Sequence, residues 1–271
     1  MPRFYLLITS LFVMFNIVFL SRLINLHAAD EIKGGITEEL RGPLSITGEG
    51  NLYYHACATC HGVKGDGKGP SAYQLNLKPR DFTLSSYKCR STPSGSLPTD
   101  TDIFKSITRG LHGTSMPSWK PLLSEMQIWN LVGFIKTFSE EFKEEGPEEP
   151  IKISEEVPLT SESISEGKKI YADNKCWECH GHEGKGDGPK SDELVDDFGN
   201  QIKPGNFTKG VYRCGGSSVD LYRTIVTGLN GTPMPSYADS IQSEKERWHL
   251  VHYIRSLKKK KNLIDYLFIN N

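Results

Sequence analysis

One short pattern occurs twice in this chain and constrains its fold more than any other feature. Cys-x-x-Cys-His stands at residues 57–61 and again at residues 176–180, in a chain of 271 residues with six cysteines. Further matching motifs follow both copies in the same order: a glycine-rich stretch, Lys-Pro, Phe-Thr, a tyrosine and basic residue before cysteine, Gly-Thr-x-Met-Pro-Ser, and Trp-x-Leu-Val. Matching positions lie 118 to 125 residues apart, so only short loop insertions separate the copies. Such self-similarity predicts two copies of one structural unit.

Each copy predicts a small helical domain with long loops. Apolar residues recur at helical spacing after Asp102 and after Asp220, which we expect to act as N-caps, and again from Trp129 and from Trp248. In the first copy, Trp129 is expected on the same buried face as Leu131. Glycine-rich segments after the two histidines cannot be regular helix, and no stretch alternates like a strand. We therefore predict an all-α protein with tandem domains at residues 45–140 and 163–258.

Cys-x-x-Cys-His is the attachment pattern for c-type haem. Cysteines three residues apart lie on one face of a helical turn, where both can form thioether bonds to the vinyl groups of one porphyrin. The next residue, histidine, can then ligate the iron. A zinc site would need a second ligand pair nearby, and a redox dithiol would need a βαβ context; neither is present in the sequence. The expected attachment cysteines are Cys57, Cys60, Cys176 and Cys179, and the expected proximal ligands are His61 and His180.

Two methionines are the candidates for the sixth iron ligand. Met116 and Met234 occupy equivalent positions in Gly-Thr-x-Met-Pro-Ser, in a chain with five methionines. A methionine more often fills a core than binds a metal, but its repetition here favours ligation. Thioether ligation raises the reduction potential, which suits an electron carrier. His112 could compete for the first iron, but its counterpart in the second copy is Asn230.

These motifs together resemble the class I c-type cytochromes in their tandem dihaem form. The resemblance covers residues 45–140 and 163–258 and implies two haem c groups, each wrapped by helices. It also implies that a proline after each proximal histidine offers its carbonyl to the imidazole; Pro70 and Pro189 match those positions. The Phe-Thr, Tyr-Lys-Cys-Arg and Met-Pro-Ser-Trp stretches resemble cytochrome subunits of respiratory oxidoreductases, some of which accompany molybdenum enzymes of nitrogen metabolism.

Electron transfer without catalysis is the function that these residues favour. A carrier needs both axial iron positions filled, whereas an enzyme needs an open position or an acid–base constellation, and the sequence offers neither. The alternatives are a haem-bearing docking subunit of a larger oxidoreductase complex and a dihaem peroxidase-like enzyme. A formal net charge of −1 excludes a basic nucleic-acid footprint. The expected partners are therefore redox proteins.

The segments outside the repeats predict export and flexible connection. Residues 1–29 have a basic start, an apolar run and a small pair, Ala28-Ala29, typical of a signal peptide, with an uncleaved membrane anchor as the alternative. We expect a periplasmic or equivalent extracytoplasmic protein, membrane-associated if the leader is retained. Residues 139–166 contain ten glutamates, and within them 141–162 are expected to form an extended acidic linker that packs poorly. A basic and apolar tail, residues 259–271, closes the chain.

Two cysteines remain after the haem motifs are assigned. Cys89 and Cys214 occupy the same position in the repeat. They can be two separate buried thiols, or they can form one disulfide between the copies in an exported protein. Because a disulfide needs Cα atoms within about 7 Å, the sequence leaves both readings open.

Overall fold

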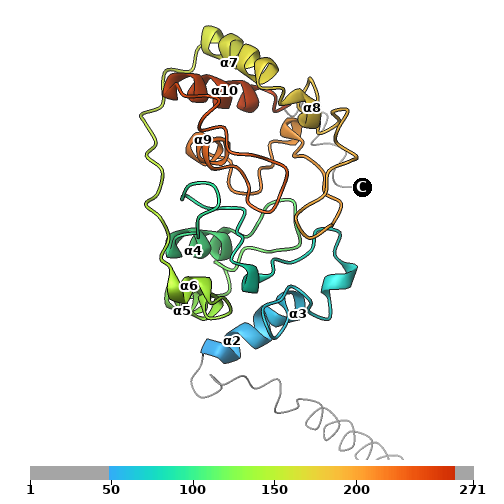
Figure 1. Ribbon diagram of the computed structural model, residues 1–271, viewed down its shortest axis with the longest axis vertical. Helices are drawn as coiled ribbons and strands as arrows, with labels where there is room; N and C mark the ends of the chain where they lie inside the picture. The colour runs from blue at the N-terminus through green and yellow to red at the C-terminus, as the bar shows by residue number, and fades with distance from the viewer. Residues whose placement is uncertain (1–48, 260–271) are drawn as a thin grey trace, which may run out of the picture. The chain divides into compact units, whose positions relative to one another are not determined.

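A computed structural model describes residues 49–259 of the chain (Figure 1). Throughout that range the secondary structure is helical, apart from one isolated bridge between Val195 and Gln201. The all-α prediction is confirmed for these residues. The longer helices are α2 (Glu49–Ala56), α4 (Asp100–Arg109), α5 (Glu125–Lys136), α7 (Ser161–Asp173), α9 (Ser218–Thr227) and α10 (Glu244–Ser256). The short helices are α3 (Ala58–His61), α6 (Glu141–Glu144) and α8 (Trp177–His180). The 3-10 turns are η2 (Ala72–Gln74), η3 (Phe82–Leu84) and η4 (Phe207–Lys209).

Equivalent helices in the two copies begin in the same way. Thr99 caps α4 and Ser217 caps α9, and each forms a capping box with an aspartate three residues later. Those aspartates are Asp102 and Asp220, so the prediction that they are the N-caps is wrong by three residues. A capping box explains the shift, because the aspartate at the third position accepts from the cap residue's backbone N–H. Both carboxylates are buried.

The first hydrophobic core lies between α4, α5 and the start of the described chain. Ile128, Leu131 and Val132 of α5 are almost fully buried against Tyr53. Trp129 does not share that face: it is 39% exposed and its ring stacks on Phe104 at 4.2 Å. The expectation that Trp129 belongs to the buried stripe is therefore wrong, because the residue one step earlier takes its place.

The second core is built on a close crossing of α7 and α10, which lie side by side in Figure 1. Gly167 sits at the crossing, where an added Cβ would lie 1.9 Å from the carbonyl oxygen of His249. Trp248 is 1% exposed here, unlike Trp129 at the equivalent position of the first copy. Tyr222 packs on it, with ring centroids 4.5 Å apart. Close packing at the glycine lets α10 bury nearly the whole of this face.

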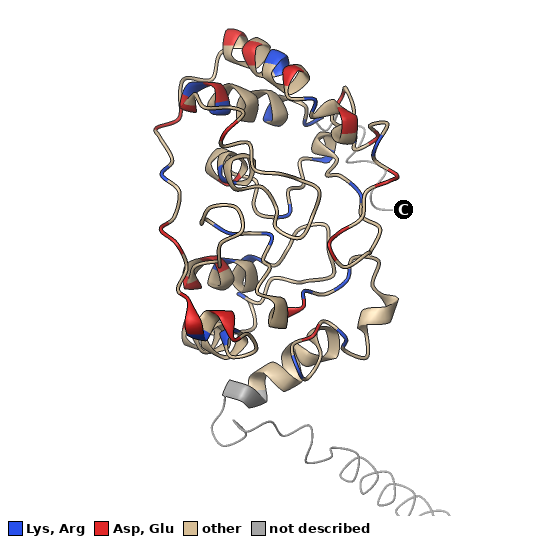
Figure 2. Ribbon diagram, in the orientation of Figure 1, with Lys and Arg blue, Asp and Glu red and all other residues tan. Residues whose placement is uncertain are grey.

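The acidic segment between the copies begins with α6, runs without regular secondary structure over residues 145–160, and is packed. Acidic residues gather on α6 and along the strand-like path that follows it (Figure 2). Ile151 donates its N–H to Ser91 of the first copy at 2.8 Å. Ser154 accepts a 3.0 Å hydrogen bond from the Trp248 indole of the second copy. The prediction of poor packing is wrong, because apolar residues interspersed with the glutamates pack against the second core. These are Ile151, Ile153 and Val157.

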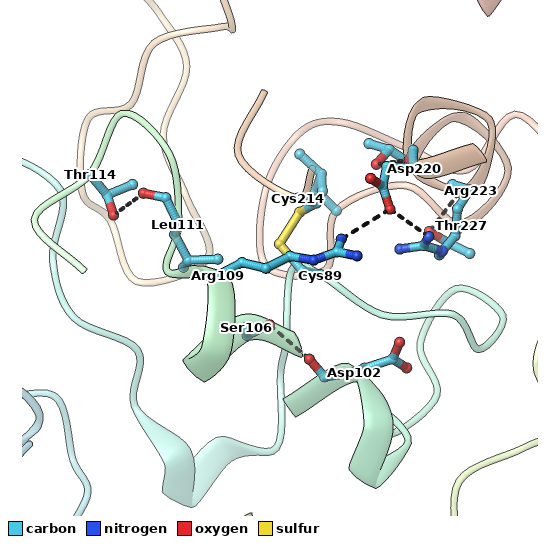
Figure 3. Close-up of a disulfide and its surroundings, with 12 residues drawn as sticks. Cys89, Asp102, Ser106, Arg109, Leu111, Thr114, Cys214, Asp220, Arg223 and Thr227 are labelled. Carbon is cyan, nitrogen blue, oxygen red and sulfur yellow. Dashed lines mark hydrogen bonds and ion pairs between the residues drawn. A yellow bond between two sulfur atoms is a disulfide. The ribbon is translucent and has the colours of Figure 1, made fainter. Parts of the chain in front are cut away.

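A disulfide joins Cys89 to Cys214, with Cα atoms 5.2 Å apart (Figure 3). This resolves the question left open by the sequence in favour of a bond between the copies. Arg109 lies nearby and reaches Asp220 at 3.5 Å. Between residues 49 and 259 no helix is both long and apolar enough to span a bilayer. The predicted leader, and the tail from residue 260, lie outside the described residues.

Candidate haem sites

Both Cys-x-x-Cys-His motifs form single helical turns that end at the histidine. Each turn stops at a glycine with positive φ, 79° at Gly62 and 78° at Gly181. That conformation favours glycine, which explains the His-Gly pair in both motifs. Buried tyrosine hydroxyls of the preceding helices fix the two stops: Tyr53 donates to the Gly62 carbonyl at 2.8 Å, and Tyr171 to the Gly181 carbonyl at 2.7 Å.

The proximal imidazoles are held in one orientation by a hydrogen bond and a stacked ring. His61 Nδ1 lies 3.0 Å from the carbonyl oxygen of Arg80, and its ring stacks on Phe82 with centroids 4.5 Å apart. The second copy repeats this arrangement with distances of 3.1 Å and 4.4 Å, in the residues His180, Gly205 and Phe207. With Nδ1 hydrogen-bonded, Nε2 would be the atom that ligates a haem iron. Burial lowers the pKa of both imidazoles, which favours the neutral form that ligates metals.

The carbonyl partners of these imidazoles correct one prediction. Pro70 and Pro189 are exposed, and the carbonyls that meet the imidazoles belong to Arg80 and Gly205 instead. The assignment of the two prolines was therefore wrong. The long loop after each motif turns back later than expected, so the carbonyl that returns to the histidine lies just after Pro79 in the first copy and at the equivalent place in the second.

The two methionine loops have the same internal structure. In the first, Leu111 donates its N–H to the Met116 carbonyl at 3.1 Å, and the Met116 N–H reaches the Thr114 hydroxyl at 3.1 Å. In the second copy the same bonds measure 3.0 and 3.3 Å and involve Leu229, Met234 and Thr232. A glycine with positive φ precedes each loop, and its Cβ would clash with the backbone after the methionine; these glycines are Gly110 and Gly228. The loop is therefore rigid on both sides of the methionine.

One cavity of the first copy collects the predicted site residues. It is lined by Cys57, Cys60, His61 and Met116. Apolar side chains complete its wall, among them Leu75, Leu77, Ile103 and Ile107. His112, the competing ligand, is exposed and does not line it. In the second copy Cys176 packs against the second core, and Cys179 and His180 follow on α8.

Three buried polar atoms test whether this cavity fits a haem. Arg80 Nη1, Tyr87 Oη and Trp119 Nε1 are buried with no hydrogen-bond partner among the described residues. All three residues line the cavity. Leaving such donors unsatisfied costs about 1–3 kcal/mol each, so the cavity calls for an anionic or polar acceptor. Haem carries carboxylates at one edge of an apolar ring, so the residues present fit it.

Sequence reasoning missed these donors and the stacked rings, although a signal was available. Phe82 and Phe207 belong to the repeated Phe-Thr pair, and Tyr87 precedes the leftover cysteine. Trp119 closes the Met-Pro-Ser motif and is replaced by Tyr237 in the second copy. Residues repeated at loop positions are more informative about a site than repeated apolar residues within helices.

Comparison with known proteins agrees with this geometry. Residues 164–258 match the family model described as cytochrome c, and residues 48–135 match that of cytochrome C oxidase, cbb3-type, subunit III. A chain of the reducing HAO-like protein complex of Kuenenia stuttgartiensis is 47% identical, with a TM-score of 0.76 over 79% of this chain and 97% of that chain. The chain belongs to the class I c-type cytochromes. The prediction of tandem cytochrome c domains is thereby confirmed.

A curated relative of this cytochrome is an oxidase subunit. The cbb3-type cytochrome c oxidase subunit FixP of Azorhizobium caulinodans is 25% identical over 189 residues, or 67% of this chain. The cytochrome spans about half the length of that relative, 49%. Membership of the family implies haem c bound at Cys-x-x-Cys-His and a role in electron transfer.

Proposed function

We propose that this cytochrome carries two haem c groups and relays single electrons between redox partners. The cavity lined by Cys57, Cys60, His61 and Met116 is the observation on which the proposal rests. Cys176, Cys179, His180 and Met234 would hold the second haem in the same way. Bound haem supplies a one-electron couple at its iron.

The arrangement supports a carrier better than an enzyme. His61 is fixed by the Arg80 carbonyl and the Phe82 ring, and Met116 lines the same cavity from a loop held by internal hydrogen bonds. With His61 and Met116 both bound to a haem iron, no coordination position would remain for a substrate, and electron transfer would need little rearrangement. A peroxidase-like enzyme would need one methionine to leave its iron.

A second candidate role is that of a haem-bearing subunit of a larger oxidoreductase. The similar chains belong to a cbb3-type oxidase and to a reducing HAO-like complex. In this role the cytochrome would pass electrons to or from a bound enzyme, which extends the carrier function. Copurification of the exported chain with a large oxidoreductase would distinguish this role from that of a free carrier. We propose an extracytoplasmic location for both roles, since the Cys89–Cys214 bond suits an oxidising compartment.

An optical redox titration of the purified protein tests the carrier proposal. We expect two one-electron components, a methionine–iron charge-transfer band in the oxidised state, and a mass increase of two haems that survives denaturation. Replacing Cys57 and Cys60 by Ala should remove one haem and leave the other. A single haem, bound zinc, or a ferric spectrum with an open coordination position would contradict the proposal.

A further inference from the structure

The wall of the first cavity carries four basic side chains, of which Lys78 is exposed. Arg80, Lys88 and Arg213 all line it and are partly buried. None of the three forms an ion pair within the described part of the chain. Partly buried cations without partners are costly, because their desolvation is not offset. The cavity therefore has more positive charge than its own protein groups balance.

One of these cations comes from the other copy. Arg213 immediately precedes Cys214, which is bonded to Cys89 of the first copy. The disulfide thus brings a residue of the second domain to the wall of the first haem cavity. Asp196 and Asp197 of the second domain lie near enough to Arg80 and Lys88 to oppose the lowering of their pKa by burial. No carboxylate offsets the lowering of the pKa of Arg213, whose cause is burial.

A carboxylate is the group that this cavity wall would bind. The cations share the cavity wall with the unsatisfied donors Tyr87 Oη and Trp119 Nε1, so charge and hydrogen bonding call for the same acceptor. We propose that Arg213 is a counter-ion, supplied by the second domain, for the carboxylates of the first haem. The inference rests on the proposed function, because it assumes haem at Cys57 and Cys60.

This assignment gives the two haems different electrostatic surroundings. The position of Arg80 in the first copy is taken by Gly205 in the second, so the second copy lacks that cation. A positive charge near the iron disfavours the ferric state, which carries one more positive charge than the ferrous state. The first haem should therefore depend on a charge that the second domain supplies, and its potential should respond when that charge is removed.

Redox titration of the full-length haem-loaded protein tests the assignment. Met116→His identifies the first haem as the component whose midpoint it lowers. With Arg213→Gln, the ferrous-to-ferric ratio of that component, measured at the wild-type midpoint, should fall about threefold to tenfold, where tenfold equals 59 mV for a one-electron couple. Arg213→Lys keeps the charge and should stay near the wild-type midpoint.

Arg109→Gln is the matched control. Arg109 also bridges the copies, at 3.5 Å from Asp220, but it does not line the haem cavity. An unchanged first midpoint in Arg213→Gln, a shift of the second haem instead, or an equal shift in Arg109→Gln would overturn the inference and leave the carrier function standing. A wild-type protein without two one-electron components would overturn the proposed function itself. Alkylation of each unreduced variant verifies that the Cys89–Cys214 bond is intact.

Discussion

Arg90 donates a hydrogen bond of 2.6 Å from Nη2 to the backbone carbonyl of Thr227, 137 residues further along the chain. The carbonyl belongs to the last turn of α9, where backbone carbonyls have no N–H donor within the helix. Arg90 is 1% exposed, and its Nε also donates to the Pro93 carbonyl at 3.1 Å. A buried charged donor from the first domain therefore satisfies a helix end of the second, next to the disulfide at Cys89.

Arg90→Gln should weaken the contact between the domains. The substitution removes a buried charge-assisted hydrogen bond worth about 1.5–3 kcal/mol. Chemical denaturation followed by circular dichroism checks the loss. Arg109→Gln is the control, because a half-exposed guanidinium 3.5 Å from its partner contributes only about 0.2–1 kcal/mol. An equal loss of unfolding free energy in the two variants would mean that burial of Arg90 adds nothing to the stability of the protein.

Replacing both Cys89 and Cys214 by Ser should lower the thermal midpoint without removing haem. The bond closes a loop with a sequence separation of 125 residues. Loops on the order of 100 residues give a disulfide contribution of about 4–5 kcal/mol in the chain-entropy model. Differential scanning calorimetry measures the midpoint, and mass spectrometry counts the haems. Alkylation of both cysteines in the unreduced, denatured wild-type protein would contradict the bond.

Met116→His and Met234→His should each lower one reduction potential and leave the other nearly fixed. Imidazole stabilises ferric iron better than thioether sulfur does. Each substitution serves as the control for the other, because the two methionine loops have the same hydrogen bonds. Optical titration reads both components. If neither variant changes spectrum or potential, the sixth ligands are not these methionines.

Gly69→Ala and Gly188→Ala should each disturb one haem motif. A Cβ at Gly69 would lie 2.4 Å from the Ala58 carbonyl oxygen, and one at Gly188 would lie 2.3 Å from that of Glu178. Overpacking of this kind costs about 1–3 kcal/mol. We expect lower haem occupancy at one site per variant, measured by intact mass.

Gly133→Ala is the control for these glycines. Gly133 is exposed within α5, and a Cβ there would meet nothing within 4 Å. Because alanine is the better helix former by about 1 kcal/mol, this variant should be as stable as the wild type or more so. A loss of haem in Gly133→Ala equal to that in Gly69→Ala would rule out steric contact as the cause.

The repeated motifs were enough to predict the helical fold and the residues that line the first cavity. His61 and Met116 are 55 positions apart, yet they line one cavity because both are fixed by local rules: a helical turn ended by glycine, and a loop closed by proline and threonine. Local rules of this kind are visible in a single sequence.

Features that depend on where a long loop returns could not be predicted. Pro70 lies close to His61 in sequence, but the loop brings the Arg80 carbonyl to the imidazole instead. Trp129 and Trp248 occupy one repeat position, and only Trp248 is covered, since the acidic segment supplies Ser154 to its indole. Such differences come from tertiary contacts, which two equivalent positions do not share.

The Cys89–Cys214 bond also implies an order of assembly. As the chain is made from its N-terminus, Cys89 appears soon after Cys57 and Cys60. Its partner Cys214 does not appear until 125 residues later. Oxidation before that point could pair Cys89 only with the thiols that haem attachment needs in reduced form. The bond that locks the two domains is therefore best made last, so the maturation machinery has to keep the first copy reduced until the second has been delivered.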